Sequence, residues 1–140
     1  MIDYDKYEKS LKHLILQFDN YNHSEERTNL TALDREAIAE SVIQRFEVCF
    51  DCLWKVLKRY LGEEIGLADL PNSPKPVFRI AFENKLLVAD ISQWLTYVLA
   101  RNDTSHDYSE NKAYSVLVLM KDFIADATDL YITMTGKTWE

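Results

Sequence analysis

Glycine and proline, the residues that most often interrupt regular structure, are almost confined to one short stretch of this chain. All three prolines and two of the three glycines lie between Gly62 and Pro76, and the third glycine is Gly136. An all-β fold or a βαβ repeat needs glycine and proline turns at short intervals, so both are disfavoured in residues 1–61 and 77–135. A helical fold is the class that remains.

The same glycine positions exclude two common nucleotide-binding loops. Neither G-x-x-x-x-G-K nor G-x-G-x-x-G occurs around Gly62, Gly66 or Gly136, so the chain is not a P-loop or Rossmann nucleotide enzyme. At 140 residues we expect one domain, residues 1–140, with a core large enough to need neither disulfides nor a structural metal.

Charge and hydropathy favour a cytoplasmic protein. No run of about 18 apolar residues is present, and Met1–Asp5 lacks the basic, apolar start of a signal peptide, so we expect no membrane partner. The net charge of −7 opposes long-range attraction to nucleic acid, and we expect no DNA partner, although a local basic patch can still act.

The spacing of apolar residues predicts an all-α fold, an antiparallel four-helix up-and-down bundle with one short extra helix. Thr31 and Asp34 have the spacing of a capping box, and Asp3 and Asp90 are candidate caps of two other helices. The expected helices are residues 4–21, 31–61, 75–86, 90–101, and a last one from Asp107 or Ser109 to near Gly136. The second is apolar around more than half of its later turns, which predicts burial on two sides or a subunit interface.

Two sets of residues that resemble metal or redox ligands are better explained by packing. Cys49-x-x-Cys52 has no second ligand pair for zinc and lies mid-helix rather than at a helix start, so we interpret it as part of the core. Asp122, Asp126 and Asp129 share one face of the last helix, which we interpret as solvated surface. We therefore expect no metal in this chain.

The second helix is locally basic within an acidic protein. Arg45, Lys55, Lys58 and Arg59 lie along it. Ordinary solvated surface with snorkelling stems accounts for them, and a stripe that binds phosphate or a partner is the alternative.

Residues 101–108, Arg-Asn-Asp-Thr-Ser-His-Asp-Tyr, are the strongest candidate for chemistry. We expect a turn here, with the preceding helix fraying at Arg101, Asn102 and Asp103. The Arg101 fork of donors suits phosphate oxygens, and His106 can exchange a proton near neutral pH. Together they can cleave RNA without metal, with His106 moving protons and Arg101 stabilising charge on the phosphate.

RNA cleavage needs proton transfer at both the 2′-OH and the leaving 5′-oxygen, and one histidine serves both poorly. A dimer that brings two such segments together is therefore chemically preferable. The alternative is structural, in which these polar residues only cap and tie together two helix ends. The residues of that alternative are Arg101, Asp103, Ser105 and Asp107. The spacing alone does not choose between the two interpretations.

Several blocks of this sequence resemble the nucleotidyltransferase substrate-binding family, a branch of the HEPN superfamily. They are Val42–Glu47, Trp54–Lys58, Trp94-Leu95 and the R-N-x-T-S-H-x-Y segment that begins at Arg101. The resemblance extends from the first helix to about Tyr131, which is nearly the whole chain.

The resemblance implies a small helical bundle, usually a homodimer, encoded beside a minimal nucleotidyltransferase and similar to the substrate-binding domain of kanamycin nucleotidyltransferase. The partner is then expected to hold ATP or another NTP with Mg, and this chain to hold no cofactor and to supply the substrate-binding half. This chain has no G-S dipeptide followed by a D-x-D triad. The expected supporting residues are Asn102, Thr104, Ser105, Arg45, Trp54 and Lys58.

A related HEPN branch implies a second function, that of a metal-independent ribonuclease toxin, with RNA as substrate. In that toxin–antitoxin arrangement Arg101 and His106 match the catalytic pair, and Tyr108 matches the tyrosine that accepts AMP from the nucleotidyltransferase antitoxin. We expect the substrate-binding subunit first and the ribonuclease as the alternative.

Overall fold

The computed structural model describes the backbone of residues 1–106 and 110–139, and the side chains of residues 1–104 and 113–139. All regular structure within this part of the chain is helical, which confirms the predicted all-α fold. The elements are α1 (Asp5–Asn22), a 3₁₀ turn (Ser24–Glu26), α2 (Ala32–Glu63), α3 (Pro74–Glu83), α4 (Ile91–His106) and α5 (Glu110–Thr135).

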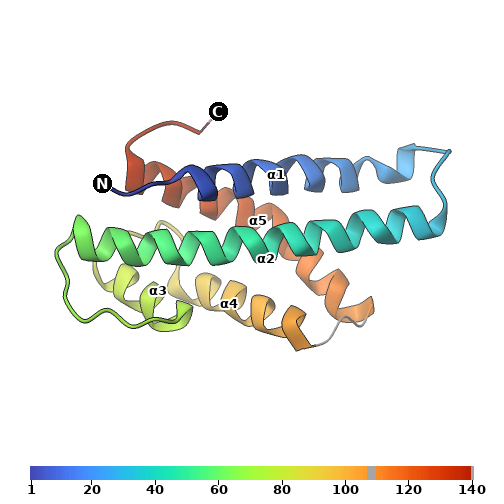
Figure 1. The fold of residues 1–140 in the computed structure, drawn as a ribbon. Helices are drawn as coiled ribbons and strands as arrows, with labels where there is room; N and C mark the ends of the chain where they lie inside the picture. The colour runs from blue at the N-terminus through green and yellow to red at the C-terminus, as the bar shows by residue number, and fades with distance from the viewer. Residues whose placement is uncertain (107–109, 140) are drawn as a thin grey trace.

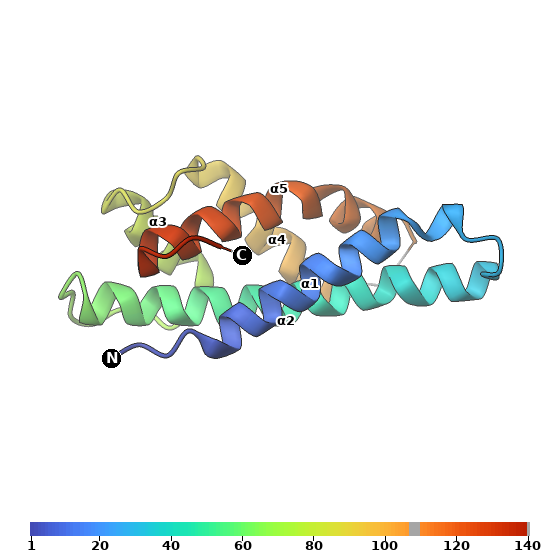
Figure 2. The same cartoon turned by 90° about the horizontal axis from the view of Figure 1, so that it is seen from above.

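The four long helices alternate in direction, and α2 is the longest of them (Figure 1). With 32 residues it is about 48 Å long. It packs against α1 on one side and against α3 and α4 on the other, with α5 crossing behind it (Figures 1 and 2). Its apolar circumference is therefore buried on two sides, as the sequence predicts.

Local signals set several helix ends. The predicted capping box is present, since the Thr31 hydroxyl accepts from the Asp34 N–H and the Asp34 carboxylate accepts from the Thr31 N–H, both at 3.0 Å. Gly136 follows α5 with φ of 71°, a left-handed conformation that a side chain disfavours. The Asp3 carboxylate accepts from the Asp5 N–H at 2.9 Å, although Tyr4 is the residue at the cap position.

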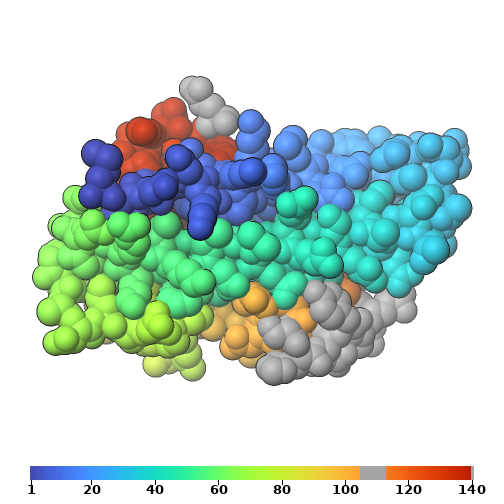
Figure 3. Space-filling view, viewed as in Figure 1, coloured from blue at the N-terminus to red at the C-terminus, as the bar shows by residue number. Residues whose placement is uncertain are grey.

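An aromatic cluster forms the centre of the core. Phe123 of α5 is fully buried and contacts rings from two other helices. Its ring centroid lies 4.9 Å from that of Phe46 and 5.1 Å from that of Tyr97, both edge to face. Trp94 stacks on Phe78 at 4.8 Å and so connects α4 to α3. In the view of Figure 3, α1 and α2 run across the middle of the face, and parts of α4 and of the segment before α3 are visible below them.

One expectation about α4 is wrong. The sequence predicts fraying at residues 101–103, but α4 continues through them to His106. Turn propensity is a weak local preference, and here contacts to α2 override it. Thr104 in this last turn is buried, and its hydroxyl lies 2.9 Å from the Arg101 carbonyl oxygen. The expected start of the last helix at Asp107 or Ser109 lies outside the described residues.

The aspartates of α5 do not all lie on solvated surface. Asp122 and Asp129 are exposed, as expected, but Asp126 is half-buried and accepts a short hydrogen bond from the Tyr97 hydroxyl. The spacing along α5 could not show this contact, because its donor comes from α4.

The Cys49-x-x-Cys52 pair is not disulfide-bonded, and Cys49 is fully buried in the core cluster, as predicted. No group of three or more His, Cys, Asp or Glu side chains that could hold a metal occurs in the described part of the chain. Within the same residues, every helix is too short or too polar to span a bilayer.

Candidate functional site

The Arg101 side chain lies at the end of α4 and crosses to α2. Its Nη1 donates to Glu47 Oε2 at 2.8 Å. Its Nε and Nη2 donate to the two carboxylate oxygens of Asp51, at 3.3 and 3.1 Å. The two-point contact with Asp51 fixes the plane of the guanidinium as well as its position.

This ion-pair cluster is partly shielded from water. The side chains of Arg101 and Glu47 are 23% and 17% exposed, and that of Asp51 is 39% exposed. Among the described side chains the guanidinium donates to two carboxylates, so an incoming phosphate meets an Arg101 whose charge is already compensated. Thr104 adds a further contact, with its hydroxyl 3.2 Å from Glu47 Oε2.

Sequence analysis named Arg101 and Thr104 but gave no role to Glu47 or Asp51. A signal for them was present, since they are two carboxylates spaced four residues apart in the part of the helix that is apolar around more than half of its circumference. Such a pair on a buried helix predicts a cation from another element, because buried charges are paired. The identity of that cation depends on the register of α4 against α2.

Two of the predicted supporting residues share a helix face with this cluster. Trp54 and Lys58 follow Asp51 by three and seven residues, which places them one and two turns further along the same side of α2. Trp54 is buried, and Lys58 Nζ donates to Asn72 Oδ1 at 3.2 Å in the segment that precedes α3.

Arg45 is not brought to Arg101. It is exposed and lies against α1 instead, with Nη1 3.4 Å from His13 Nδ1. Asn102 is exposed beside the cluster. The side chains of Ser105 and His106 lie outside the described residues, as does Tyr108, so the geometry of the predicted Arg101–His106 pair and of the AMP acceptor is not part of the described site.

Two hollows border the end of the bundle where α4 stops and α5 starts. The smaller has a volume of ≈170 Å³, lies between α4 and α5, and is lined in part by Ala100, Asp103 and Ser115. The larger, of ≈740 Å³, is formed by the end of α1, the start of α2 and the start of α5, including Tyr21 and Arg35. Pockets that hold small organic ligands usually exceed about 300 Å³, so only the larger one has that capacity.

The protein is an up-and-down helical bundle with an R-x4-H segment that begins in the last turns of α4. The arginine of this segment, Arg101, fastens α4 to α2. The chain belongs to the family described as nucleotidyltransferase substrate binding protein like, whose family model matches residues 2–135. This confirms the resemblance seen in the sequence.

Individual relatives agree with that assignment. A Haemophilus influenzae protein named probable ribonuclease HepT is 28% identical over 123 residues, which cover 86% of this chain and 82% of the relative. A solved H. influenzae structure, described as revealing the fold of a substrate binding domain of a nucleotidyltransferase, has a TM-score of 0.75 at 26% identity and covers 93% of this chain and 95% of its own. A Thermus thermophilus structure has a TM-score of 0.67 at 26% identity, covering 87% of this chain and 98% of its own.

Proposed function

We propose that this chain is the substrate-binding subunit of a two-protein nucleotidyltransferase and pairs with a separately encoded minimal nucleotidyltransferase. The observation that carries the proposal is the family match over residues 2–135, together with a solved relative described as a substrate binding domain of a nucleotidyltransferase. The partner supplies the transfer chemistry, with ATP or another NTP and Mg bound to it, because this chain has no G-S followed by D-x-D.

In this proposal the end of the bundle around Arg101 faces the partner's active site. Asn102 is exposed there, and the R-x4-H-x-Y segment continues from it. The cluster of Arg101, Glu47 and Asp51 holds α4 on α2 and so fixes where that segment begins. A homodimer, as is usual for the family, places two such ends in one assembly.

The test is co-purification of the tagged chain with the nucleotidyltransferase encoded beside it. We expect a stable complex in which the partner subunit binds ATP with Mg. The variant Asn102→Arg places a bulky cation on the exposed surface beside Arg101 and is expected to weaken the complex. A matched variant directly after α3, Asn84→Arg, is expected to leave it intact. Failure of the wild-type chain to bind the partner would overturn the proposal.

A second function is favoured by one specific observation, the relative named probable ribonuclease HepT. Under this alternative the chain cleaves RNA without metal. The 2′-oxygen attacks the adjacent phosphorus and the bond to the 5′-oxygen breaks, which leaves a 2′,3′-cyclic phosphate and a 5′-hydroxyl. His106 acts in the proton transfers at these two oxygens, and Arg101 stabilises the charge that develops on the phosphate.

The Arg101 geometry sets a condition on this alternative. The guanidinium is oriented by Asp51 and Glu47, and preorganised donors are what transition-state stabilisation requires. Its compensated charge also means that phosphate must share the guanidinium with the two carboxylates or displace them. Glu47→Gln removes one of those negative charges and is therefore expected to raise affinity for RNA.

Tyr108 connects the two functions. Its phenolic oxygen attacks the α-phosphorus of ATP on the partner, pyrophosphate leaves, the phenolic proton is released, and the tyrosine carries AMP.

The tests of the ribonuclease are RNA cleavage by the purified chain in EDTA, and intact mass after co-expression with the nucleotidyltransferase. Cleavage that His106→Ala abolishes, with an AMP adduct that Tyr108→Phe abolishes, supports the ribonuclease. No cleavage, or cleavage by His106→Ala, contradicts it.

A further inference from the structure

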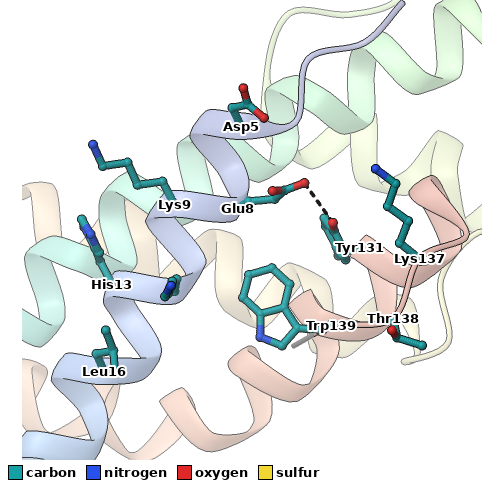
Figure 4. Close-up of a pocket in the computed structure, with 10 residues that line it drawn as sticks. Asp5, Glu8, Lys9, His13, Leu16, Tyr131, Lys137, Thr138 and Trp139 are labelled. Atoms are coloured by element: carbon teal, nitrogen blue, oxygen red, sulfur yellow. Dashed lines mark hydrogen bonds between the residues drawn. The ribbon is translucent and has the colours of Figure 1, made fainter.

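A basic surface lies on the α1 side of the bundle, across α2 from the Arg101 cluster. An open groove of ≈740 Å³ separates the first turns of α1 from the end of α5 and the segment after it (Figure 4). Its lining includes Lys9, Lys12 and His13 of α1, and Lys137 and Trp139 after α5. Neither the R-x4-H segment nor the family match assigns a role to this groove.

The groove concentrates positive charge in a protein with a net charge of −7. None of its three lysines is ion-paired within the part of the chain that the structure describes. Arg45 adds a fourth cation at the edge, next to His13. Local positive charge of this kind attracts an anion even when the whole protein is acidic.

Trp139 supplies an aromatic ring inside this basic surface. The indole is half-buried and packs edge to face on Tyr131, with ring centroids 5.1 Å apart. Figure 4 shows it between Tyr131 and α1. Burial and a hydrogen bond from the Tyr131 hydroxyl to Glu8, at 2.9 Å, raise the pKa of Tyr131, so this phenol stays neutral and holds Glu8 in place.

Two carboxylates also line the groove, Asp5 and Glu8. They restrict which anion fits, because a ligand that carries only negative groups is repelled by them. A nucleotide meets both conditions, since its phosphate suits the lysines while its amino and hydroxyl groups can donate to carboxylate oxygens. Its base can in addition stack on an indole, a contact that every base can make because each has a π-face. A peptide of acidic residues alone has no flat ring that can stack on the indole.

We infer that this groove is a nucleotide-binding site, in which Trp139 stacks on the base and Lys9, Lys12 and Lys137 hold the phosphate. The nucleotide comes either from a free mononucleotide or from a single-stranded nucleic acid that runs along the groove. The site is separate from the Arg101 cluster, and it stands whether or not the proposed function does, because it depends on no residue of that cluster.

Intrinsic tryptophan fluorescence of the full chain tests this inference. The other two tryptophans, Trp54 and Trp94, are only 9% and 1% exposed, so quenching by an added ligand reports on Trp139. The probes are AMP and a single-stranded oligoadenylate, each titrated at about 50 mM and about 200 mM salt. We expect saturable quenching that weakens as salt rises. Tighter binding of the oligonucleotide identifies nucleic acid as the source, and equal binding identifies the free nucleotide.

Variants decide whether the groove is responsible. Lys9→Glu with Lys12→Glu is expected to weaken binding by at least about tenfold, and Trp139→Leu to abolish the quenching. The matched control reverses two exposed lysines elsewhere, Lys75→Glu with Lys121→Glu, and is expected to change affinity less than about twofold. Circular dichroism confirms that each variant is folded.

Several results would overturn the inference. The first two are the absence of quenching by either probe at millimolar concentration, and quenching that persists in Trp139→Leu. The third is a loss of affinity in the control pair equal to that in Lys9→Glu with Lys12→Glu. The fourth is displacement of the oligonucleotide by polyglutamate at equal charge concentration. The last of these would identify an acidic peptide as the ligand.

Discussion

Arg101 on α4 donates to both carboxylate oxygens of Asp51 on α2, 50 positions earlier in the chain. This contact does two things at once. It anchors the last turn of α4, whose sequence alone predicts a break, and it orients the guanidinium that the sequence motif places in the chemistry. Substitutions can separate the effect on folding from the effect on function.

Arg101→Ala is expected to lower the free energy of unfolding by about 1–3 kcal/mol, because the partly buried carboxylates of Glu47 and Asp51 lose the guanidinium that donates to both. Arg101→Lys keeps the charge but loses the two-point contact, so a smaller loss is expected. Urea denaturation followed by circular dichroism measures both. Arg79→Ala, at an exposed position on α3, is the control and is expected to change stability by less than about 0.5 kcal/mol.

A double-mutant cycle attributes that loss to the ion pair. In a Glu47→Gln background the Arg101→Ala substitution is expected to cost about 0.5–2 kcal/mol less than in the wild type, since contacting residues couple. Equal costs in the two backgrounds would show that Arg101 stabilises the fold through Asp51 or through its packing rather than through Glu47.

The environment of Asp126 predicts that its contribution to folding stability falls as pH rises. Burial, and then the nearby Asp122 and Asp129, raise its pKa, although the hydrogen bond from Tyr97 opposes the rise. A folded-state pKa above the unfolded value means that the contribution of Asp126 to stability is fully present below the unfolded pKa. That contribution is lost as pH rises through the folded pKa.

In the Asp126→Asn variant the amide cannot ionise, so the variant does not lose stability as pH rises through the folded-state pKa of Asp126. The stability of the variant relative to wild type is therefore expected to increase between about pH 4 and pH 7, as measured by urea denaturation across that range. Glu83→Gln, an exposed carboxylate on α3, is the control and is expected to show no such trend. A relative stability that falls with rising pH would contradict the assignment of a raised pKa to Asp126.

Local sequence signals predicted the helices well because each of those signals acts over one turn. The capping box at Thr31 and Asp34 and the left-handed Gly136 both depend only on neighbouring residues, and both are present. The extent of α4 was missed because the contacts that extend it come from Glu47 and Asp51, more than 45 residues away.

The candidate site was predictable in its residue types but not in its contacts. The motif identified Arg101, but the two carboxylates that hold it depend on how α4 and α2 are aligned, which no local pattern contains. The groove at Trp139 was missed for the same reason. It forms between α1 and the segment after α5, which are brought together only by the closure of the bundle.

The capping box at the start of α2 gives a further prediction. Thr31→Ala removes the acceptor for the Asp34 N–H and is expected to cost about 1 kcal/mol of stability. Thr31→Ser keeps the hydroxyl and is expected to restore most of it, measured by urea denaturation. An alanine variant as stable as the serine variant would show that this end of α2 frays without consequence.

The two cysteines differ in environment, and thiol labelling can detect the difference. Cys49 is fully buried, and burial raises the pKa of its thiol to about 12 despite a hydrogen bond with Ser10. Cys52 is only partly buried. Because the thiolate is the reactive form, iodoacetamide at about pH 8 is expected to add one group per folded chain, at Cys52.

Intact mass and peptide mapping measure the number and position of these adducts. The Cys52→Ser variant is expected to remain unlabelled until urea unfolds it, after which Cys49 reacts. In unfolded wild type both cysteines are expected to react at similar rates, because the difference comes from folding and not from local sequence. Labelling of folded Cys52→Ser at the rate of its unfolded form would show that Cys49 is accessible, and the C-x-x-C pair would again be a candidate for redox chemistry or metal binding rather than a part of the core.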